Sequence, residues 1–296
     1  MIHYTGCPVC NSKEIKEQLT AKDYTVSQQP FVIWHCNKCT ARFTQDVPAQ
    51  DAIGAYYASD NYISHSDTKK GLINSLYHFV RNITLASKKN LVKKYAGINK
   101  GALLDIGCGT GAFLHTMKNA GWVVTGLEPD EQARAKAASM YDINPMPSQK
   151  LFELEPASYH AITMWHVLEH VHELHAYMKQ LGNLLSPSGK LFIAVPNYTS
   201  NDAEIYGEHW AAYDVPRHLY HFSPQSINNL LLQHNLKLVS LQPMWFDSFY
   251  VSMLSEKYKT GKGNIIKGFI KGFTSNIKAW KDKSKCSSVI YIISKK

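Results

Sequence analysis

The stretch Leu103-Leu104-Asp105-Ile106-Gly107-Cys108-Gly109-Thr110-Gly111-Ala112-Phe113-Leu114 decides the fold of this chain. Its apolar start predicts a short buried strand, its three alternate glycines a tight turn, and its end the first turn of a helix. A helix N-terminus presents free N–H groups and the positive end of a dipole. A strand, a glycine turn and a helix in this order are therefore typical of an α/β fold with a loop that binds a nucleotide-type ligand.

The glycines alone leave the ligand open, because Gly107, Gly109 and Ala112 also fit the dinucleotide fingerprint. Asp105 narrows the choice, since a carboxylate at this place would repel a pyrophosphate but suits a ligand with an ammonium group. Glu128 ends a second predicted strand, where an acid is placed to accept hydrogen bonds from both hydroxyls of a ribose.

The glycine stretch and Glu128 resemble motifs I and II of the class I S-adenosylmethionine-dependent methyltransferases, and the resemblance runs from about residue 99 to the C-terminus. It implies a Rossmann-like α/β sheet of seven strands with an antiparallel last strand, and S-adenosylmethionine as the cofactor. Pro216-Arg217-His218-Leu219 resembles a recurring segment in a large group of bacterial methyltransferases of mostly unassigned substrate. The cofactor-binding residues that the resemblance implies are Asp105, Gly107, Cys108, Gly109, Gly111, Glu128, Pro129, Trp165 and His166.

Two C-x-x-C pairs near the N-terminus predict a metal site. Each pair places two thiolates on one turn, and four thiolates complete a tetrahedral zinc site. We predict a small zinc ribbon over residues 1–46, with loss of the metal or disulfide formation as the alternative. A closed site of this kind leaves no open position for chemistry, so its zinc is structural. The predicted ligands are Cys7, Cys10, Cys36 and Cys39.

Residues 47–98 are expected to form a linker and a helical cap, because an N-terminal helical segment caps the cofactor pocket in similar methyltransferases. By position alone, Tyr62 and His65 are candidates for contact with the cofactor, and plain packing is the alternative. The methyltransferase domain is expected over residues 99–296.

A predicted fourth strand ends at His166, and the residues after it, Val167-Leu168-Glu169-His170-Val171, continue a resemblance to motif IV of the family. In that family the strand end lies beside the methionine moiety and the methyl group. His166 is therefore our candidate for a residue near the transferred methyl.

Residues 197–222 form a histidine-rich segment that is long for a loop in a compact domain. Segments that leave the carboxyl ends of strands border the ligand crevice of a doubly wound sheet, so we expect this loop to line the substrate site. Arg217 is a candidate for binding a carboxylate or phosphate. His218 or His221 is a candidate for a general base that acts on a hydroxyl. Ordering of the loop alone is the alternative.

The formal net charge of +9 sits in one segment, because residues 253–296 hold eleven lysines and two acids. An insertion is expected at about 247–286. On a helix, its apolar residues from Ile265 to Trp280 fall within an arc of about 140° around the helix axis, and lysines lie on the opposite side. Such a helix either packs on the domain or lies in a membrane interface. Because it follows the end of the predicted sixth strand, we expect it beside the active site.

The sequence contains no apolar run near the roughly 20 residues that span a bilayer, and no signal-peptide pattern. We expect a cytoplasmic protein. If the helix lies in a membrane interface, we expect peripheral contact with the inner membrane face through residues 262–281. The oligomeric state stays open.

We predict methyl transfer from S-adenosylmethionine to a small-molecule or lipid-linked acceptor. O-methylation is favoured, because the Asn/Asp-Pro-Pro-Tyr/Phe motif frequent in amino-methylating nucleic-acid enzymes does not follow the fourth strand. One alternative is an RNA methyltransferase that docks through the zinc ribbon and the lysine-rich segment, although a uniformly basic chain would fit a nucleic-acid partner better. The other is a non-catalytic binding module that keeps the cofactor fold.

Overall fold

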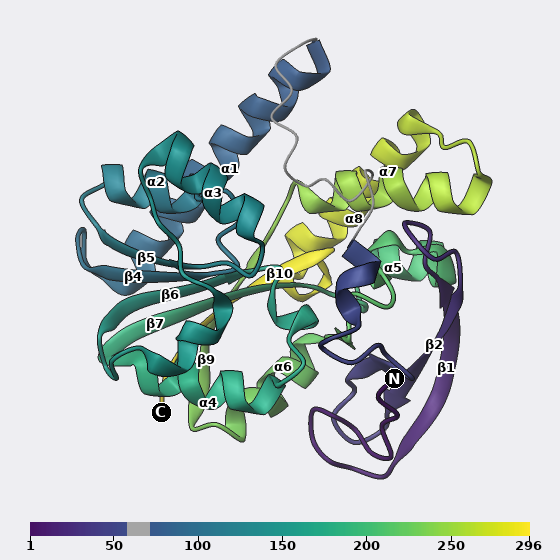
Figure 1. Ribbon diagram of the computed structural model, residues 1–296. Coiled ribbons are helices and arrows are strands. Elements are labelled where there is room, and N and C mark those ends of the chain that lie inside the picture. Colours follow the sequence, from purple (N-terminus) through teal and green to yellow (C-terminus); the bar gives the residue numbers. More distant parts are fainter. Residues whose placement is uncertain (58–71) are drawn as a thin grey trace.

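The computed structural model describes residues 1–57 and 72–296, with described side chains from Val80 onward in the second range. A mixed sheet with helices on both faces forms the main body, and a smaller antiparallel sheet lies beside it (Figure 1).

The main sheet has the strand order β5-β4-β6-β7-β10-β9. The first four strands are parallel, and β10 lies antiparallel between β7 and β9. The strands are β4 (Ala102–Ile106), β5 (Val123–Leu127), β6 (Tyr159–Trp165), β7 (Leu185–Pro196), β9 (Leu236–Pro243) and β10 (Ser288–Lys295). This arrangement confirms the α/β fold with a reversed last strand.

The expected seventh strand is reduced to one parallel bridge between Leu127 and Met146, so the count of seven was wrong for the described residues. Met146 exchanges backbone hydrogen bonds with Gly126 and Glu128. Pro145 and Pro147 flank it, and a proline has no N–H group to extend the ladder.

Helices α1, α2 and α3 cover one face of the main sheet, and α4 and α6 cover the other (Figure 1). Apolar side chains of the strands pack between these layers and form a core on each face. The bounds are α1 (Leu72–Ala96), α2 (Ala112–Asn119), α3 (Glu131–Tyr141), α4 (Leu174–Leu184) and α6 (Pro224–Leu232).

The small sheet has the order β1-β2-β3-β8 and is antiparallel throughout. Three of its strands come from the N-terminal segment, namely β1 (Ile15–Lys22), β2 (Pro30–Cys36) and β3 (Arg42–Thr44). The fourth, β8 (Tyr220–His221), comes from the histidine-rich loop after β7. The N-terminal unit is therefore continuous with the loop that we expect to line the substrate site.

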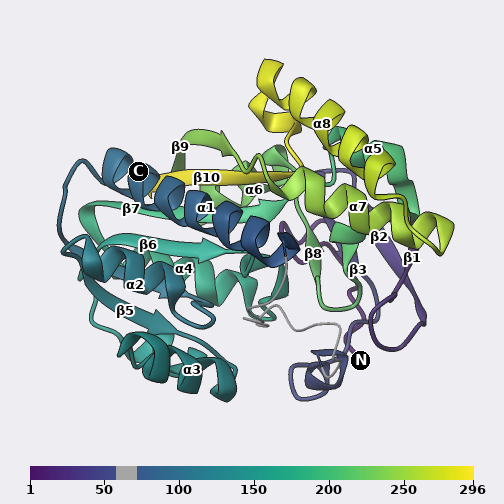
Figure 2. The same cartoon turned by 90° about the horizontal axis from the view of Figure 1, so that it is seen from above.

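The predicted insertion forms a helical hairpin of α7 (Asp247–Thr260) and α8 (Ile265–Lys281), which stands out beyond the end of the main sheet (Figure 2). The two helices approach closely through Gly268 and Gly272, where a β-carbon would overlap the backbone of α7. Ser275 also donates a hydrogen bond of 2.7 Å to the buried Asp202, in α5 (Asn201–Tyr206). None of the described helices combines the length and the apolar character that crossing a bilayer requires.

Candidate functional site

The glycine loop between β4 and α2 has the backbone that the sequence predicts. Gly107, Gly109 and Gly111 have φ of +70°, +54° and +80°, a region that side-chain-bearing residues rarely adopt. A β-carbon on Gly107 would also overlap a methyl group of Val167. Gly111 caps α2 without a side-chain hydrogen bond, so the first N–H groups of that helix stay available to a ligand.

Asp105 and Glu128 lie at the ends of neighbouring parallel strands. Asp105 is buried, and its Oδ1 accepts a hydrogen bond of 2.6 Å from Thr163 Oγ1. Burial raises the pKa of Asp105 to about 7, although Thr163 and the charge of Lys88 oppose this. Its Oδ2 has no hydrogen-bond partner among the described residues, so it can accept a bond from a ligand cation.

Glu128 holds the glycine loop in place. Its Oε2 accepts a hydrogen bond of 2.8 Å from the N–H of Gly109, and its Oε1 accepts one of 3.0 Å from the N–H of Asp130. A carboxylate has about four lone-pair positions, so two remain for hydroxyl groups of a ligand. Cys108 is buried and packs under the loop, whereas Pro129 is exposed at its rim.

Two donors at this strand end, Trp165 Nε1 and Lys88 Nζ, make no hydrogen bond to the part of the chain that the structure describes. Trp165 Nε1 is buried and makes no hydrogen bond among the described residues. Lys88, on α1, places its Nζ 4.4 Å from the centroid of the Trp165 ring, and burial lowers its pKa while Asp247 and Asp105 oppose the shift. A ligand with both an ammonium and a carboxylate group fits this arrangement, with Asp105 facing the first and the two donors facing the second. The residues present therefore fit the methionine end of S-adenosylmethionine.

His166, directly after β6, is held between two carboxylates. Its Nε2 lies 2.9 Å from Asp247 Oδ2, and its Nδ1 lies 3.4 Å from Glu169 Oε1. Burial lowers the pKa of His166, but the two carboxylates outweigh this and raise it to about 10. The backbone φ of +58° at this residue directs the side chain across the strand end. The insertion therefore contacts the end of β6 through Asp247.

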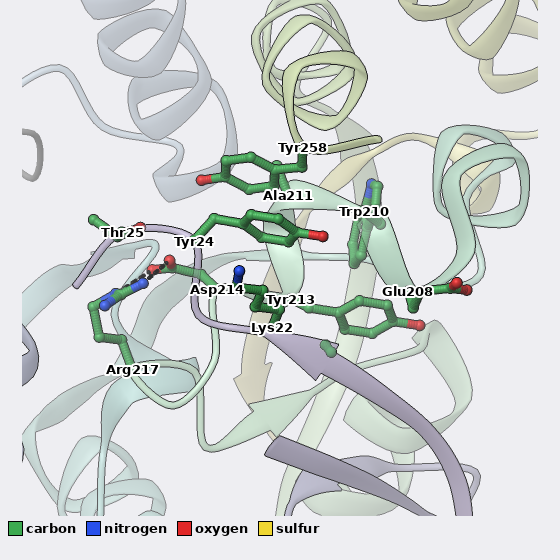
Figure 3. A pocket seen from close by; sticks show the side chains of 11 residues that line it. Lys22, Tyr24, Thr25, Glu208, Trp210, Ala211, Tyr213, Asp214, Arg217 and Tyr258 are labelled. Atoms are coloured by element: carbon green, nitrogen blue, oxygen red, sulfur yellow. Dashed lines mark hydrogen bonds and ion pairs between the residues drawn. The ribbon is translucent and has the colours of Figure 1, made fainter. Parts of the chain in front are cut away.

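Arg217 lies in a buried network of charges and lines a small pocket together with Tyr24 and Tyr258 (Figure 3). Its Nε and Nη2 donate hydrogen bonds of 3.0 and 2.6 Å to Asp214, and Nη2 also lies 3.0 Å from Asp23 in the N-terminal segment. Nη1 donates to the carbonyl oxygen of Tyr56. Four donor contacts to protein groups give Arg217 a role in joining the N-terminal segment to the loop, and its contact with substrate stays a prediction.

The two candidate bases of the loop differ in their surroundings. His221 lies in β8, its Nε2 is 3.0 Å from Thr44 Oγ1, and burial lowers its pKa well below the usual range. His218 places its Nδ1 2.9 Å from the carbonyl oxygen of Ala212 and packs edge-on against the ring of His170, with centroids 4.6 Å apart. His218 thus belongs to the group around Glu169, whereas His221 belongs to the small sheet.

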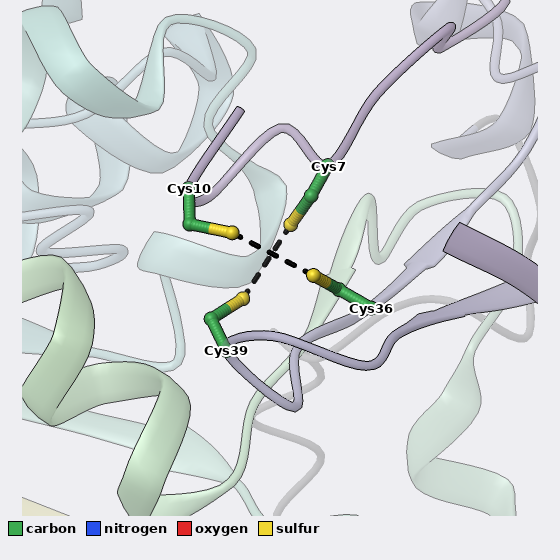
Figure 4. Close-up of side chains that lie close together, drawn as sticks. All are labelled: Cys7, Cys10, Cys36 and Cys39. Carbon is green, nitrogen blue, oxygen red and sulfur yellow. Dashed lines mark hydrogen bonds between the residues drawn. The ribbon is translucent and has the colours of Figure 1, made fainter. Parts of the chain in front are cut away.

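The four cysteines of the two knuckles converge on one point (Figure 4). Their Sγ atoms pair at 3.5 Å for Cys7 and Cys39 and at 3.6 Å for Cys10 and Cys36, and no disulfide joins them. Zinc–sulfur bonds of about 2.3 Å in a tetrahedron separate the sulfurs by about 3.8 Å. The donor set and its spacing therefore fit a zinc ion.

The structure thus brings the predicted cofactor residues and His166 to one edge of the main sheet, while Tyr62 and His65 lie outside the described residues. Sequence reasoning missed Lys88 and Asp247, since nothing local distinguishes either from other charged residues of its helix. Glu169 was also missed as a functional residue, although its place between two histidines in His166-x-x-Glu169-His170 was a visible signal.

Comparison with known proteins gives a consistent result. The model of a methyltransferase-domain family matches residues 78–241. The ubiquinone biosynthesis O-methyltransferase of Idiomarina loihiensis is 26% identical over 169 residues, which cover 52% of this chain and 69% of that protein. The protein of the same name from Maricaulis maris is 29% identical over 150 residues, covering 46% of this chain and 59% of the relative.

One solved structure, a SAM-dependent methyltransferase from Archaeoglobus fulgidus, has a similar fold. The two superpose with a TM-score of 0.50 at 20% identity, over 73% of this chain and 94% of that one. At this identity the likeness concerns the fold alone.

Proposed function

The chain belongs to the methyltransferase-domain family and is an S-adenosylmethionine-dependent methyltransferase, and from this premise we propose that it methylates an oxygen atom of a small-molecule or lipid-linked acceptor. The observation that carries the cofactor part is the pairing of Asp105 and Glu128 at neighbouring strand ends around the glycine loop. The names of the relatives support an oxygen acceptor.

Each residue of the cofactor site has a distinct part in this proposal. Asp105 accepts a hydrogen bond from the ammonium group of the cofactor, and Lys88 and Trp165 Nε1 face the carboxylate of the cofactor. Glu128 accepts hydrogen bonds from the ribose hydroxyls. The cofactor supplies a methyl group that its sulfonium already activates. The protein therefore mainly has to hold the acceptor in line with that methyl, which makes positioning a large part of catalysis.

An oxygen acceptor also has to lose its proton. The group around Glu169, with His166 on one side and His170 and His218 on the other, lies next to the end of β6 and is suited to this task. Asp247 fixes the orientation of His166 from the opposite side. His221 makes its hydrogen bond to Thr44 within the small sheet, so we assign it a structural role.

We include in the proposal a membrane contact through α8, whose surface divides into three sectors. Small residues from Gly268 to Ala279 are buried against the protein, and a lysine sector includes Lys271 and Lys278. The third sector is apolar and, among the described residues, exposed, which favours the membrane interface of the two alternatives that the sequence left open. The exposed fractions are 76% for Ile265, 75% for Ile266, 53% for Phe269, Ile270 and Phe273, 44% for Ile277 and 80% for Trp280.

A lipid surface with anionic headgroups is the partner that fits this surface. An apolar helix face of this size marks a membrane or protein contact in a folded protein. The flanking lysines add attraction to negative lipid, which is typical of interfacial helices. Trp245 and Phe246 are also 39% and 40% exposed, and the carbonyl oxygen of Trp245 accepts a hydrogen bond of 2.8 Å from Asn276 in α8. Phe246 directly precedes Asp247. An acceptor dissolved in the membrane would thus meet the protein next to His166.

The four cysteines are proposed to bind a structural zinc ion. Their site would stabilise the N-terminal unit, whose sheet takes its last strand from the histidine-rich loop. The zinc ion would in this way support the loop that carries His218, without taking part in the reaction.

The test is the transfer of a labelled methyl group from S-adenosylmethionine to separated lipid, aqueous, RNA and protein fractions of a cell extract. We expect label in small organic-soluble molecules, in a form that resists alkali as an ether does. An Asp105→Asn variant serves as the inactive control. Label confined to RNA, to protein or to amines would contradict the proposal.

A further inference from the structure

Three side chains with metal-binding groups lie close together next to His166. Glu169 and His170 come from the short turn after β6, and His218 comes from the histidine-rich loop. A backbone hydrogen bond of 2.8 Å from Leu219 to the carbonyl oxygen of Glu169 joins the two segments. One ligand atom from each of the three side chains lies within 4.8 Å of the others.

Among the described residues, Glu169 has an ion pair with His166 but no hydrogen bond. The residue is fully buried, and neither carboxylate oxygen accepts a hydrogen bond from the described residues. Its nearest cationic neighbour is His166, at 3.4 Å from Oε1 and outside good hydrogen-bond geometry. Leaving a buried charge without hydrogen bonds costs several kcal/mol, so such a group is normally paired or bound to a metal.

The two histidines present lone pairs instead of protons to the same space. His170 Nδ1 lies 3.1 Å from the carbonyl oxygen of Arg217 and 2.9 Å from the hydroxyl oxygen of Tyr57, and His218 Nδ1 lies 2.9 Å from the carbonyl oxygen of Ala212. A carbonyl oxygen only accepts and a tyrosine hydroxyl can accept, so a proton on Nδ1 satisfies both contacts of His170 and the contact of His218. In this tautomer Nε2 of each ring keeps its lone pair. Neither Nε2 has a hydrogen-bond partner among the described residues.

No donor from the described residues lies between these three acceptors, and they repel one another unless a cation occupies the space. We propose that Glu169, His170 and His218 bind a divalent transition-metal ion. Two imidazoles and one carboxylate, with each imidazole fixed through its other nitrogen, form a donor set typical of such ions. Metal bonds of about 2.1 Å separate ligand atoms by about 3–4 Å, so small side-chain movements complete the site.

This proposal rests on the proposed oxygen acceptor and says how that oxygen is prepared. Three protein ligands leave coordination positions of the metal open. The acceptor hydroxyl binds to the metal at one of these open positions. The metal lowers the pKa of the bound hydroxyl, and its proton passes to solvent. The oxygen then forms the new bond to the methyl carbon while the bond from that carbon to sulfur breaks, with its electron pair staying on sulfur. His218 is thus a metal ligand and not a free base.

The test is a titration with Co²⁺ of the full chain whose cysteine knuckles already hold zinc, followed by calorimetry and visible absorption. We expect one Co²⁺ per chain without the thiolate bands that cysteine ligands produce. Glu169→Gln and His218→Ala should each weaken Co²⁺ binding at least tenfold. His209→Ala, a histidine of the same loop outside the cluster, should bind as the wild type does.

Stability measurements separate loss of the site from loss of the fold. Co²⁺ should raise the melting temperature of the wild type and of His209→Ala, and should leave that of Glu169→Gln and His218→Ala unchanged. No Co²⁺ uptake by the wild type, or equal uptake by the cluster variants, would overturn the metal site. Methyl transfer to an oxygen without any Co²⁺ binding would overturn this inference alone, whereas Co²⁺ binding without such transfer would count against the proposed function.

Discussion

The exposed apolar face of α8 supports a quantitative prediction about membrane binding. The perturbation is the double change Ile266→Ser and Ile270→Ser, at side chains that are 75% and 53% exposed. Full burial of an isoleucine side chain contributes about 2 kcal/mol, so in proportion to exposure the two together contribute about 2.5 kcal/mol. Since each 1.4 kcal/mol is tenfold in affinity, we expect roughly 60-fold weaker binding to vesicles.

The assay is flotation with vesicles made of equal parts of phosphatidylcholine and phosphatidylglycerol. The matched control is Leu232→Ser, which removes an apolar side chain of 48% exposure from α6, outside this surface. The control should float as the wild type does. A Lys271→Glu and Lys278→Glu variant should float less, and added salt should weaken the flotation of the wild type, because salt screens the attraction to anionic lipid.

A double serine variant that floats as well as the wild type would contradict a membrane contact through α8. A wild type that stays unbound would contradict it as well. A wild type that stays unbound and forms a dimer, with the double serine variant monomeric, would assign the apolar face to a second copy of the chain.

Three further changes test other parts of the account. Gly107→Ala should weaken S-adenosylmethionine binding at least tenfold in calorimetry, because positive φ costs about 1–2 kcal/mol for alanine and its β-carbon overlaps a valine; unchanged affinity would contradict this. The affinity of the wild type should fall as pH falls through about 7, since Asp105, which faces Lys88 and Glu128, takes up a proton there and no longer pairs with an ammonium group; a flat profile from pH 6 to 8 would refute the assignment. Cys36→Ser should reduce bound zinc in metal analysis and lower the melting temperature, and a fully zinc-loaded variant would argue against the four-cysteine site.

The parts that could be predicted from sequence depend on short-range patterns. Asp105, the three glycines and Glu128 lie within one strand–turn–helix–strand unit, and the chain direction alone brings the two acids to the same edge. Each cysteine pair is likewise a short-range pattern, and its C-x-x-C spacing alone predicts a metal site. The reversed last strand followed from the family resemblance, not from local pattern.

The parts that could not be predicted depend on contacts between distant segments. The pairing of His166 with Asp247 requires the whole hairpin to fold back onto the strand end. Helical periodicity indicated an apolar face on α8 but not which face the protein covers. Gly268 and Gly272, whose intrinsic helix propensity is low, provide the contact surface of α8 with α7. Likewise, nothing near Arg217 indicated its partner Asp23 in the N-terminal segment.

The binding of S-adenosylmethionine by the Asp105–Gly111 loop is the central claim, and calorimetry at pH 8 tests it most directly. Asp105→Asn removes one charge at the site, and Asp142→Asn makes the same chemical change at an exposed residue beyond α3. We predict wild-type affinity for Asp142→Asn and roughly thirtyfold weaker binding for Asp105→Asn, with the fold of both intact. The reason is that removing one partner of a buried charge pair costs about 2 kcal/mol or more of binding free energy. Equal affinity of Asp105→Asn and the wild type would contradict the claim.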